Sequence, residues 1–211
     1  MSSNLNICVI NAGNTLTNYV ELFKTIDETV VVHLLDIADA DQVKLISPLD
    51  GIILTGSSDL KTSDTVNIPA DLLDIGIPVI GVSYGFYWMV AQKGGIVNLE
   101  QTGLKHDFNK YIVISKPFQV SLKKYMFSHR EYVDALPNNW INVLTFNNEV
   151  LIAYEEATKH LGVHFQPELN KSTSLEFYKG WLNWIKKEVF TTEILQGSDQ
   201  VQDPLLGEPT Y

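Results

Sequence analysis

The sequence has little cysteine, no long apolar run and no cluster of metal-binding side chains, and each absence excludes a class of protein. Cys8 is the only cysteine among the 211 residues, so an internal disulfide framework cannot form. No apolar stretch approaches the roughly 20 residues of a membrane-spanning helix, and the first residues lack the basic and apolar segments of a signal peptide. His and Cys residues do not have the spacing of a zinc site. These absences predict a cytoplasmic protein without a membrane span, a bound metal or another cofactor.

Positive charge is also scarce. The chain has 15 Lys and Arg residues against 25 Asp and Glu residues, and its formal net charge is −10. Arg130 is the only arginine. Such a chain repels phosphate backbones and anionic lipid surfaces. We therefore expect it to bind neither nucleic acid nor membranes.

Short apolar runs alternate with helical patterns in the first half of the chain. This alternation predicts parallel strands joined by helical crossovers that cover both faces of a sheet. The expected strands are 5–10, 30–35, 50–54 and 78–82, and the expected helices are 19–26, 68–75 and 86–92. The second half is richer in strands, expected at 111–115, 141–146, 150–154 and 161–165, before an amphipathic helix at 176–189. The predicted fold class is therefore α/β, with three layers and a mostly parallel central sheet.

The composition changes near residue 190. Residues 191–211 contain glycine and proline and few runs that could form a core. We expect a single domain at 1–190 and a C-terminal tail at 191–211, which is either solvated or docks a partner through its apolar residues. Outside the motifs discussed next, His33 is expected in the core and His160, beside polar residues, on the surface.

One motif indicates chemistry. Residues 81–85 read Gly-Val-Ser-Tyr-Gly, between an expected strand and an expected helix, which is the pattern of a nucleophile elbow. A sharp turn there would project Ser83 above the sheet. The glycines would let the neighbouring backbone pass close by, and the helix N-terminus would favour developing negative charge. The alternative is a tight turn in which Ser83 only caps the helix.

Five segments, taken together and in order, resemble the class I glutamine amidotransferases, especially the glutaminase part of GMP synthetase. They are the turn at 11–14, the oxyanion-loop segment 50–58, the elbow 77–85, the serine-histidine loop 127–133 followed by Leu136-Pro137, and the segment 162–168. The resemblance spans residues 5–168 and implies a flavodoxin-like three-layer fold. It also implies a substrate pocket lined by Gly56, Ser57, Tyr84, Tyr87, Ser128 and His129.

The departures from the family pattern affect its chemistry. The family's nucleophilic cysteine is Ser83 here, and its histidine base is Gln166. A serine needs a strong base beside it, and a glutamine amide cannot accept the proton. Glu168, which in the family orients the histidine, remains. Ser57 stands where the family usually has a second glycine, and Tyr87 where it has a substrate-contacting glutamine.

The combined losses predict a pseudoenzyme that serves as a protein-binding, regulatory or structural subunit. We expect a protein partner or self-association, and weak or absent glutamine binding. Two alternatives stay open: a serine hydrolase or peptidase-like enzyme that uses Ser83, and a residual glutamine-hydrolysing subunit. The hydrolase would need His164 or His129 as its base. His164 lies two residues before Gln166, which on a strand is the same face but about 6–7 Å further back.

Overall fold

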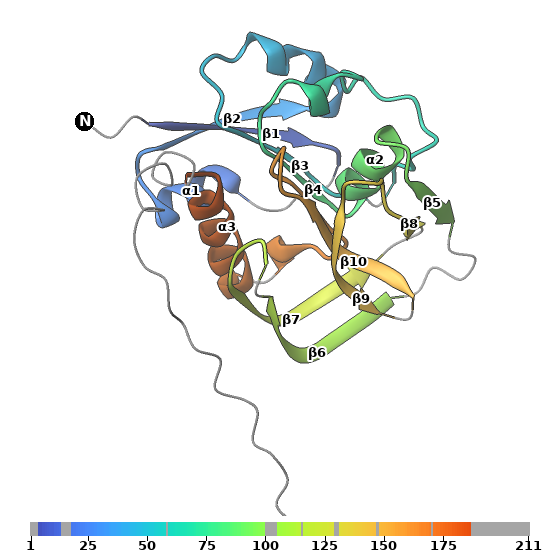
Figure 1. The fold of residues 1–211 in the computed structure, drawn as a ribbon. Helices are drawn as coiled ribbons and strands as arrows, with labels where there is room; N and C mark the ends of the chain where they lie inside the picture. Colours follow the sequence, from blue (N-terminus) through green and yellow to red (C-terminus); the bar gives the residue numbers. More distant parts are fainter. Residues whose placement is uncertain are drawn as a thin grey trace, which may run out of the picture.

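A computed structural model of the chain describes residues 4–13, 18–57, 59–99, 105–114, 116–128, 131–146, 148–169 and 171–186. At its centre is a seven-stranded sheet with the order β2-β1-β3-β4-β11-β10-β9 (Figure 1). Its strands are β1 (Leu5–Asn11), β2 (Val30–Asp36), β3 (Gly51–Leu54), β4 (Val79–Val82), β9 (Ile141–Phe146), β10 (Glu149–Glu155) and β11 (His160–Val163). Five neighbouring strands, from β2 to β11, are parallel, and β10 and β9 extend the sheet in antiparallel pairing. The predicted α/β class with a mostly parallel sheet is confirmed.

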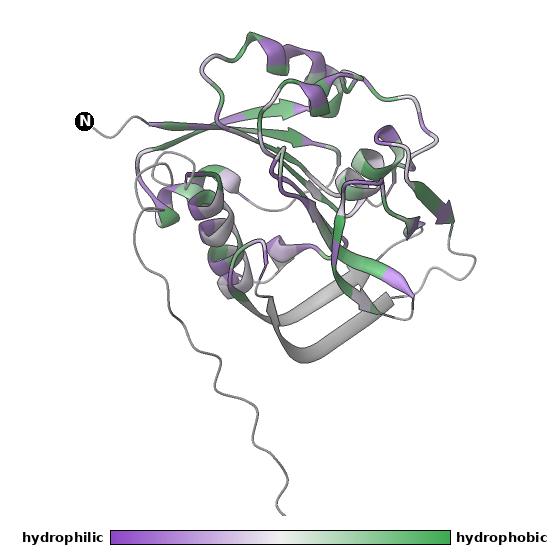
Figure 2. Ribbon diagram, in the orientation of Figure 1, coloured by the Kyte–Doolittle hydropathy of each residue, from purple (hydrophilic) through white to green (hydrophobic). Residues whose placement is uncertain are grey.

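Helices cover both faces of this sheet, which gives three layers. Helices α1 (Tyr19–Ile26) and α3 (Lys171–Lys186) lie side by side on one face, and α2 (Tyr84–Gln92) lies on the other (Figure 1). Alternate residues of β1 serve the two sides: Ile7 and Val9 pack with α1 and α3, whereas Cys8 and Ile10 pack on the side of α2. Figure 2 shows the hydrophobic residues concentrated along the central strands.

Smaller elements complete the fold. Two antiparallel pairs lie outside the main sheet, β5 (Ile96–Leu99) with β8 (Glu131–Ala135) and β6 (Lys105–Ile114) with β7 (Val120–Ser128). Three 3₁₀ segments connect other elements: η1 (Ile37–Leu45), η2 (Leu72–Asp74) and η3 (Pro167–Leu169). No helix within the described ranges combines the length and apolar character needed to cross a bilayer.

Several elements differ from those predicted from the sequence. The helix expected at 68–75 is only the short η2, because its backbone bonds run from Leu72 to Pro69 and from Asp74 to Asp71, three residues apart. The last helix begins at 171 instead of 176, and β11 ends at Val163 instead of at residue 165. Strands β5, β7 and β8 were not predicted. The expected tail at 191–211 lies outside the described residues.

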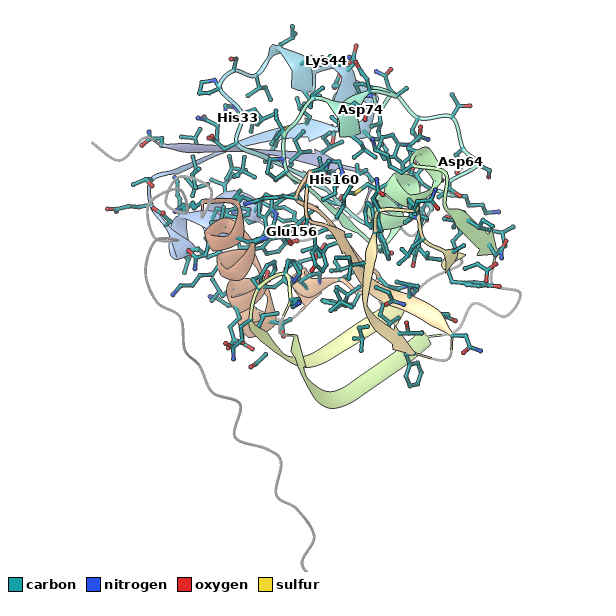
Figure 3. The ribbon with its side chains drawn as sticks, in the orientation of Figure 1. His33, Lys44, Asp64, Asp74, Glu156 and His160 are labelled. Atoms are coloured by element: carbon teal, nitrogen blue, oxygen red, sulfur yellow. The ribbon has the colours of Figure 1, made fainter. Side chains whose placement is uncertain are left out.

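His160 was expected on the surface, and this expectation was wrong. It lies in the interior of the molecule (Figure 3), where it begins β11 next to the central strand β4. Only 1% of it is exposed. Burial lowers the pKa of His160 to about 4, although the Glu155 carboxylate, whose Oε2 lies 3.7 Å from Nδ1, raises it in part. The partly buried His33 contacts Asn6 Oδ1 through Nε2 at 3.2 Å. Cys8 is buried as expected, and burial raises its pKa to about 12.

Candidate active site

Ser83 lies at the sharp turn between β4 and α2, as the elbow pattern predicts. Its backbone angles are φ 49° and ψ −110°, which a non-glycine residue adopts only when its surroundings enforce them. The amide of Ser83 donates to the Val163 carbonyl at 2.7 Å, and its carbonyl accepts from the Tyr87 amide at 3.1 Å. The side chain of Ser83 makes no capping bond to the α2 backbone. Ser83 is therefore held in a strained turn between strand and helix, and its side chain does not cap the helix.

Two glycines make this turn possible. A β-carbon on Gly81 would lie 2.6 Å from the carbonyl carbon of Gly85, and one on Gly85 would overlap the Leu54 carbonyl of β3. Any larger residue at either position would push α2 away from the sheet. The glycines of the motif are thus explained by the packing of the helix start against two strands.

The side chain of Gln166 reaches the elbow. A β-carbon placed on Gly56, just after β3, would lie 3.2 Å from both Gln166 Nε2 and the β-carbon of Ser83. Three residues that are far apart in the sequence therefore lie close together: Gly56, Ser83 and Gln166. The group beside the candidate nucleophile is an amide, which carries no basic nitrogen at neutral pH.

Tyr87 connects Ser83 to a buried histidine. The Tyr87 hydroxyl lies 3.2 Å from His164 Nδ1, and the two rings meet edge to face. Burial raises the pKa of Tyr87 well above its ordinary value, and a hydrogen bond from the Ser83 side chain lowers it in part. Ser83 and Tyr87 are each 3% exposed, and His164 is 2% exposed. The phenol thus lies between the serine and the imidazole, and all three side chains are buried.

Ser57 stabilises its own loop. Its Oγ accepts hydrogen bonds from the amides of Asp59 and Leu60, at 3.2 and 3.1 Å. The same Oγ would lie 2.9 Å from a β-carbon on Gly13, in the turn after β1. Ser57 therefore holds the segment that follows β3 close to the turn after β1.

Tyr84 and Glu131 form a second buried polar group beside the elbow. Burial raises the pKa of Tyr84, as do the Asp64 and Glu131 carboxylates, and its hydroxyl has no hydrogen-bond partner among the described residues. Glu131, 6% exposed, accepts from the Thr62 amide at 3.0 Å and from the Thr62 hydroxyl at 2.6 Å. Asp64 lies on the same loop, at the periphery in Figure 3. Sequence reasoning missed Glu131, although it lies within the predicted serine-histidine loop.

Glu168 faces a different set of partners, on the side of α1 and α3. Tyr19 donates to Glu168 Oε1 at 3.3 Å, and the hydroxyls of Tyr19 and Tyr178 are 3.3 Å apart. Burial raises the pKa of Glu168 to about 7, while hydrogen bonds from its own backbone and from both tyrosines lower it in part. Its Oε2 is buried without a partner among the described residues. The contacts of these tyrosines with Glu168 were not predicted, because the helical pattern indicates only that such tyrosines belong to the core.

Two further residues of the predicted pocket, Ser128 and His129, cannot be placed in this site. Ser128 ends β7, and nothing is described of its side chain, while His129 lies outside the described residues. No three His, Cys, Asp or Glu side chains in the described part of the chain gather as a metal ion would require. The site therefore brings together the Ser83 hydroxyl, the Gln166 amide, the Tyr87 phenol and the His164 imidazole.

Comparison with known proteins identifies this architecture. Residues 8–179 match the model of the glutamine amidotransferase class-I family. The chain is similar to the glutamine-hydrolysing GMP synthases of Streptococcus mutans, with 28% identity over 140 residues, and Prochlorococcus marinus, with 32% identity over 138 residues. These alignments cover 62% and 61% of this chain but only 26% and 25% of the relatives, so the chain matches about a quarter of their length.

Two solved structures share the fold. A Thermoplasma acidophilum protein, described as a proposed GMP synthase subunit, superposes with a TM-score of 0.70 at 15% identity, over 92% of this chain and 100% of that one. A glutamine amidotransferase from Thermotoga maritima superposes with a TM-score of 0.65 at 16% identity, over 92% of this chain and 89% of that one. At such identities the likeness concerns the fold alone.

The buried Glu168 carboxyl gives a testable pH dependence. Its pKa is raised from 4.5 to about 7 in the folded state, so the folded state binds its proton more tightly than the unfolded state. This stabilisation is complete below pH 4.5 and is lost as the pH rises through about 7. Relative to Glu168→Gln, the wild type should lose on the order of 3 kcal/mol of unfolding free energy across that window.

Urea unfolding of both proteins at several pH values measures the difference. Glu176→Gln, at an exposed position of α3, is the control for removing one acidic side chain. A constant difference between wild type and Glu168→Gln at all pH values would contradict the prediction.

Proposed function

The chain belongs to the class I glutamine amidotransferase family, and we propose that it is a non-catalytic member that acts as a protein-binding, regulatory or structural subunit. The observation that carries the proposal is the Gln166 amide beside Gly56 and Ser83. The resemblance gives this position to the histidine base. Without a proton acceptor there, the Ser83 hydroxyl remains a weak nucleophile.

The closure of the site supports the same proposal. Only 3% of Ser83 is exposed, and Tyr87, at the position of a substrate-contacting glutamine in the family, is buried against His164. A substrate carboxamide must come within about 3–3.5 Å of the attacking oxygen. The phenol occupies space next to that oxygen, so we expect glutamine to bind weakly or not at all.

A partner is inferred from the relatives. The similar GMP synthases contain the matched segment within polypeptides about four times as long as the match, so in them this segment shares a chain with other parts. In this protein, we propose that residues 1–190 form the domain that contacts another protein or a second copy, and that residues 191–211 form a tail. The identity of the partner does not follow from these likenesses.

We expect no glutaminase activity. Ammonia release from glutamine should stay at background for the wild type and for Ser83→Cys, because a thiol beside Gln166 has no imidazole to ionise it. When residues act as a unit, losing one removes most of the rate and further losses do not add. A coupled ammonia assay, with an active class I enzyme as positive control, measures this.

Turnover by the wild type would instead establish the residual glutaminase function. Turnover by Ser83→Cys alone would show that another group serves as base. Titration calorimetry with glutamine separates binding from chemistry, and micromolar affinity would show that the pocket has survived.

A second candidate function, a serine hydrolase, is favoured by one specific observation. Ser83 keeps the strained elbow conformation, and Tyr87 connects its hydroxyl to the His164 imidazole. On substrate attack, the Ser83 proton would pass to the Tyr87 oxygen while the Tyr87 proton passes to His164. The phenol would remain neutral throughout, which is consistent with its raised pKa.

A fluorophosphonate probe distinguishes the two functions. If the chain is non-catalytic, Ser83 should not be labelled above the level of the Ser83→Ala variant. Labelling that disappears in both Tyr87→Phe and His164→Ala, with folding intact by circular dichroism, would establish the hydrolase instead.

Association with a protein is the positive part of the proposal. A specific interface should bury about 1,000 Å² or more in total. Light scattering coupled to size-exclusion chromatography should show self-association of the full chain, or native extract should yield a stoichiometric partner. The same experiment on residues 1–190 tests the contribution of the tail. A monomer in both forms, with no partner recovered, would leave the proposal without support.

A further inference from the structure

A cavity lies between α1 and the start of α3, away from Ser83 and Tyr87. Its volume is about 380 Å³, which is in the lower range of small-molecule sites. It is lined by Asn18, Glu21, Leu22, Thr25, Glu168, Lys171, Ser174 and Leu175. Nothing in the proposed function uses this space.

Two of the residues that line this cavity each have a buried side-chain oxygen without a partner among the described residues. These oxygens are Oε2 of Glu168 and Oγ of Ser174, a residue that is 3% exposed. A buried polar atom without a hydrogen bond costs about 1–3 kcal/mol. Both residues line the cavity, but neither atom is open to it as the side chains stand, so a ligand there would bond to them only if both side chains turned toward it; satisfying the two atoms would favour that turn.

The charges around the cavity favour a cation. Two carboxylates, Glu21 and Glu168, and one ammonium, Lys171, line it, and Lys171 is exposed. The chain as a whole carries a net charge of −10, which attracts cations over longer distances. Leu22 of α1 and Leu175 of α3 add apolar surface to the same walls.

We propose that this cavity binds a small primary alkylamine, whose ammonium group hydrogen-bonds to the Glu168 carboxylate and the Ser174 hydroxyl and whose alkyl chain packs against Leu22 and Leu175. An ammonium group has three donors and no acceptor, which matches two acceptor oxygens without partners. The inference does not depend on whether Ser83 reacts, because the cavity lies on the face covered by α1 and α3.

The affinity should depend on pH in a defined direction. Tyr19 of α1 and Tyr178 of α3 face the Glu168 carboxyl, and Glu21 and Lys171 line the same cavity. An alkylammonium stays protonated up to about pH 10, whereas the pKa of Glu168 is about 7. Protons therefore compete with the amine at acidic pH, and affinity should rise between about pH 6 and pH 8.

Calorimetry on the full chain with n-butylamine and 1,4-diaminobutane tests the proposal, with 1-butanol as the uncharged probe. We expect saturable binding of an amine with a dissociation constant on the order of 1 mM or tighter. Glu168→Gln should weaken binding at least about tenfold and abolish its pH dependence, because the charged hydrogen bond is lost. Lys171→Ala should bind equally well or up to about threefold more tightly, because a like charge is removed.

Glu176→Gln is the matched control, since it removes an equal charge from an exposed position of the same helix. It should bind the amine as the wild type does. The proposal is overturned if neither amine binds saturably, if Glu168→Gln binds as tightly as wild type, or if 1-butanol binds as tightly as the amine. A loss of binding in Glu176→Gln equal to that in Glu168→Gln would also overturn it, because the attraction would then be a general surface effect.

Discussion

The close approach of the α2 backbone to strand β3 is the contact on which the geometry of the site depends. Gly85 lies directly against the Leu54 carbonyl, and Gly81 lies against the first turn of the helix. This contact forces the chain to reverse within one residue, so Ser83 takes a positive φ. On β11, which pairs with β4, Gly162 lies under the ring of Phe86. The helix start, β3 and β11 therefore hold one another in place.

The pKa of the Glu168 carboxyl depends on which groups face it. A carboxylate that has an imidazolium beside it keeps a low pKa, because the opposite charge offsets the cost of burial. Here the tyrosine hydroxyls of α1 and α3 are its neighbours, and burial dominates. The group therefore titrates near neutrality and faces a cavity that its place in the family pattern does not predict.

Those features that depend on periodicity could be predicted from the sequence. The parallel strands are continuous apolar runs, and the strand-turn-helix context of Ser83 follows from the two glycines that flank it. The convergence of Gln166 with Gly56 was accessible only through the family resemblance, because no local pattern connects a residue just after β3 with one beyond β11. Strands β5 and β8 were not predicted. A short pair outside the main sheet has one exposed side, and its apolar and polar residues alternate only weakly.

His160 shows a different limit of sequence reasoning. Its polar neighbours in the hairpin turn suggested exposure, but β11 lies between β4 and β10, so its first residue is already inside the sheet. The role of Tyr19 and Tyr178 beside Glu168 was not predicted for a related reason. Their rings belong to the core, as the helical pattern indicates, and only the three-dimensional structure shows that both hydroxyls meet at one carboxyl.

Helix α2 is buried along almost its whole length, from Tyr84 to Val90. A helix in such surroundings tolerates few substitutions at any position, whatever the protein does, because each side chain fills a fixed volume. The two glycines of the Gly-x-Ser-x-Gly pattern at its start are then required by this packing, whether or not the protein turns over a substrate. Mutational drift is free to act only on side chains that the packing does not require. Searches for reactive members of this fold should therefore give the elbow glycines little weight and examine the residue beside Gly56 instead.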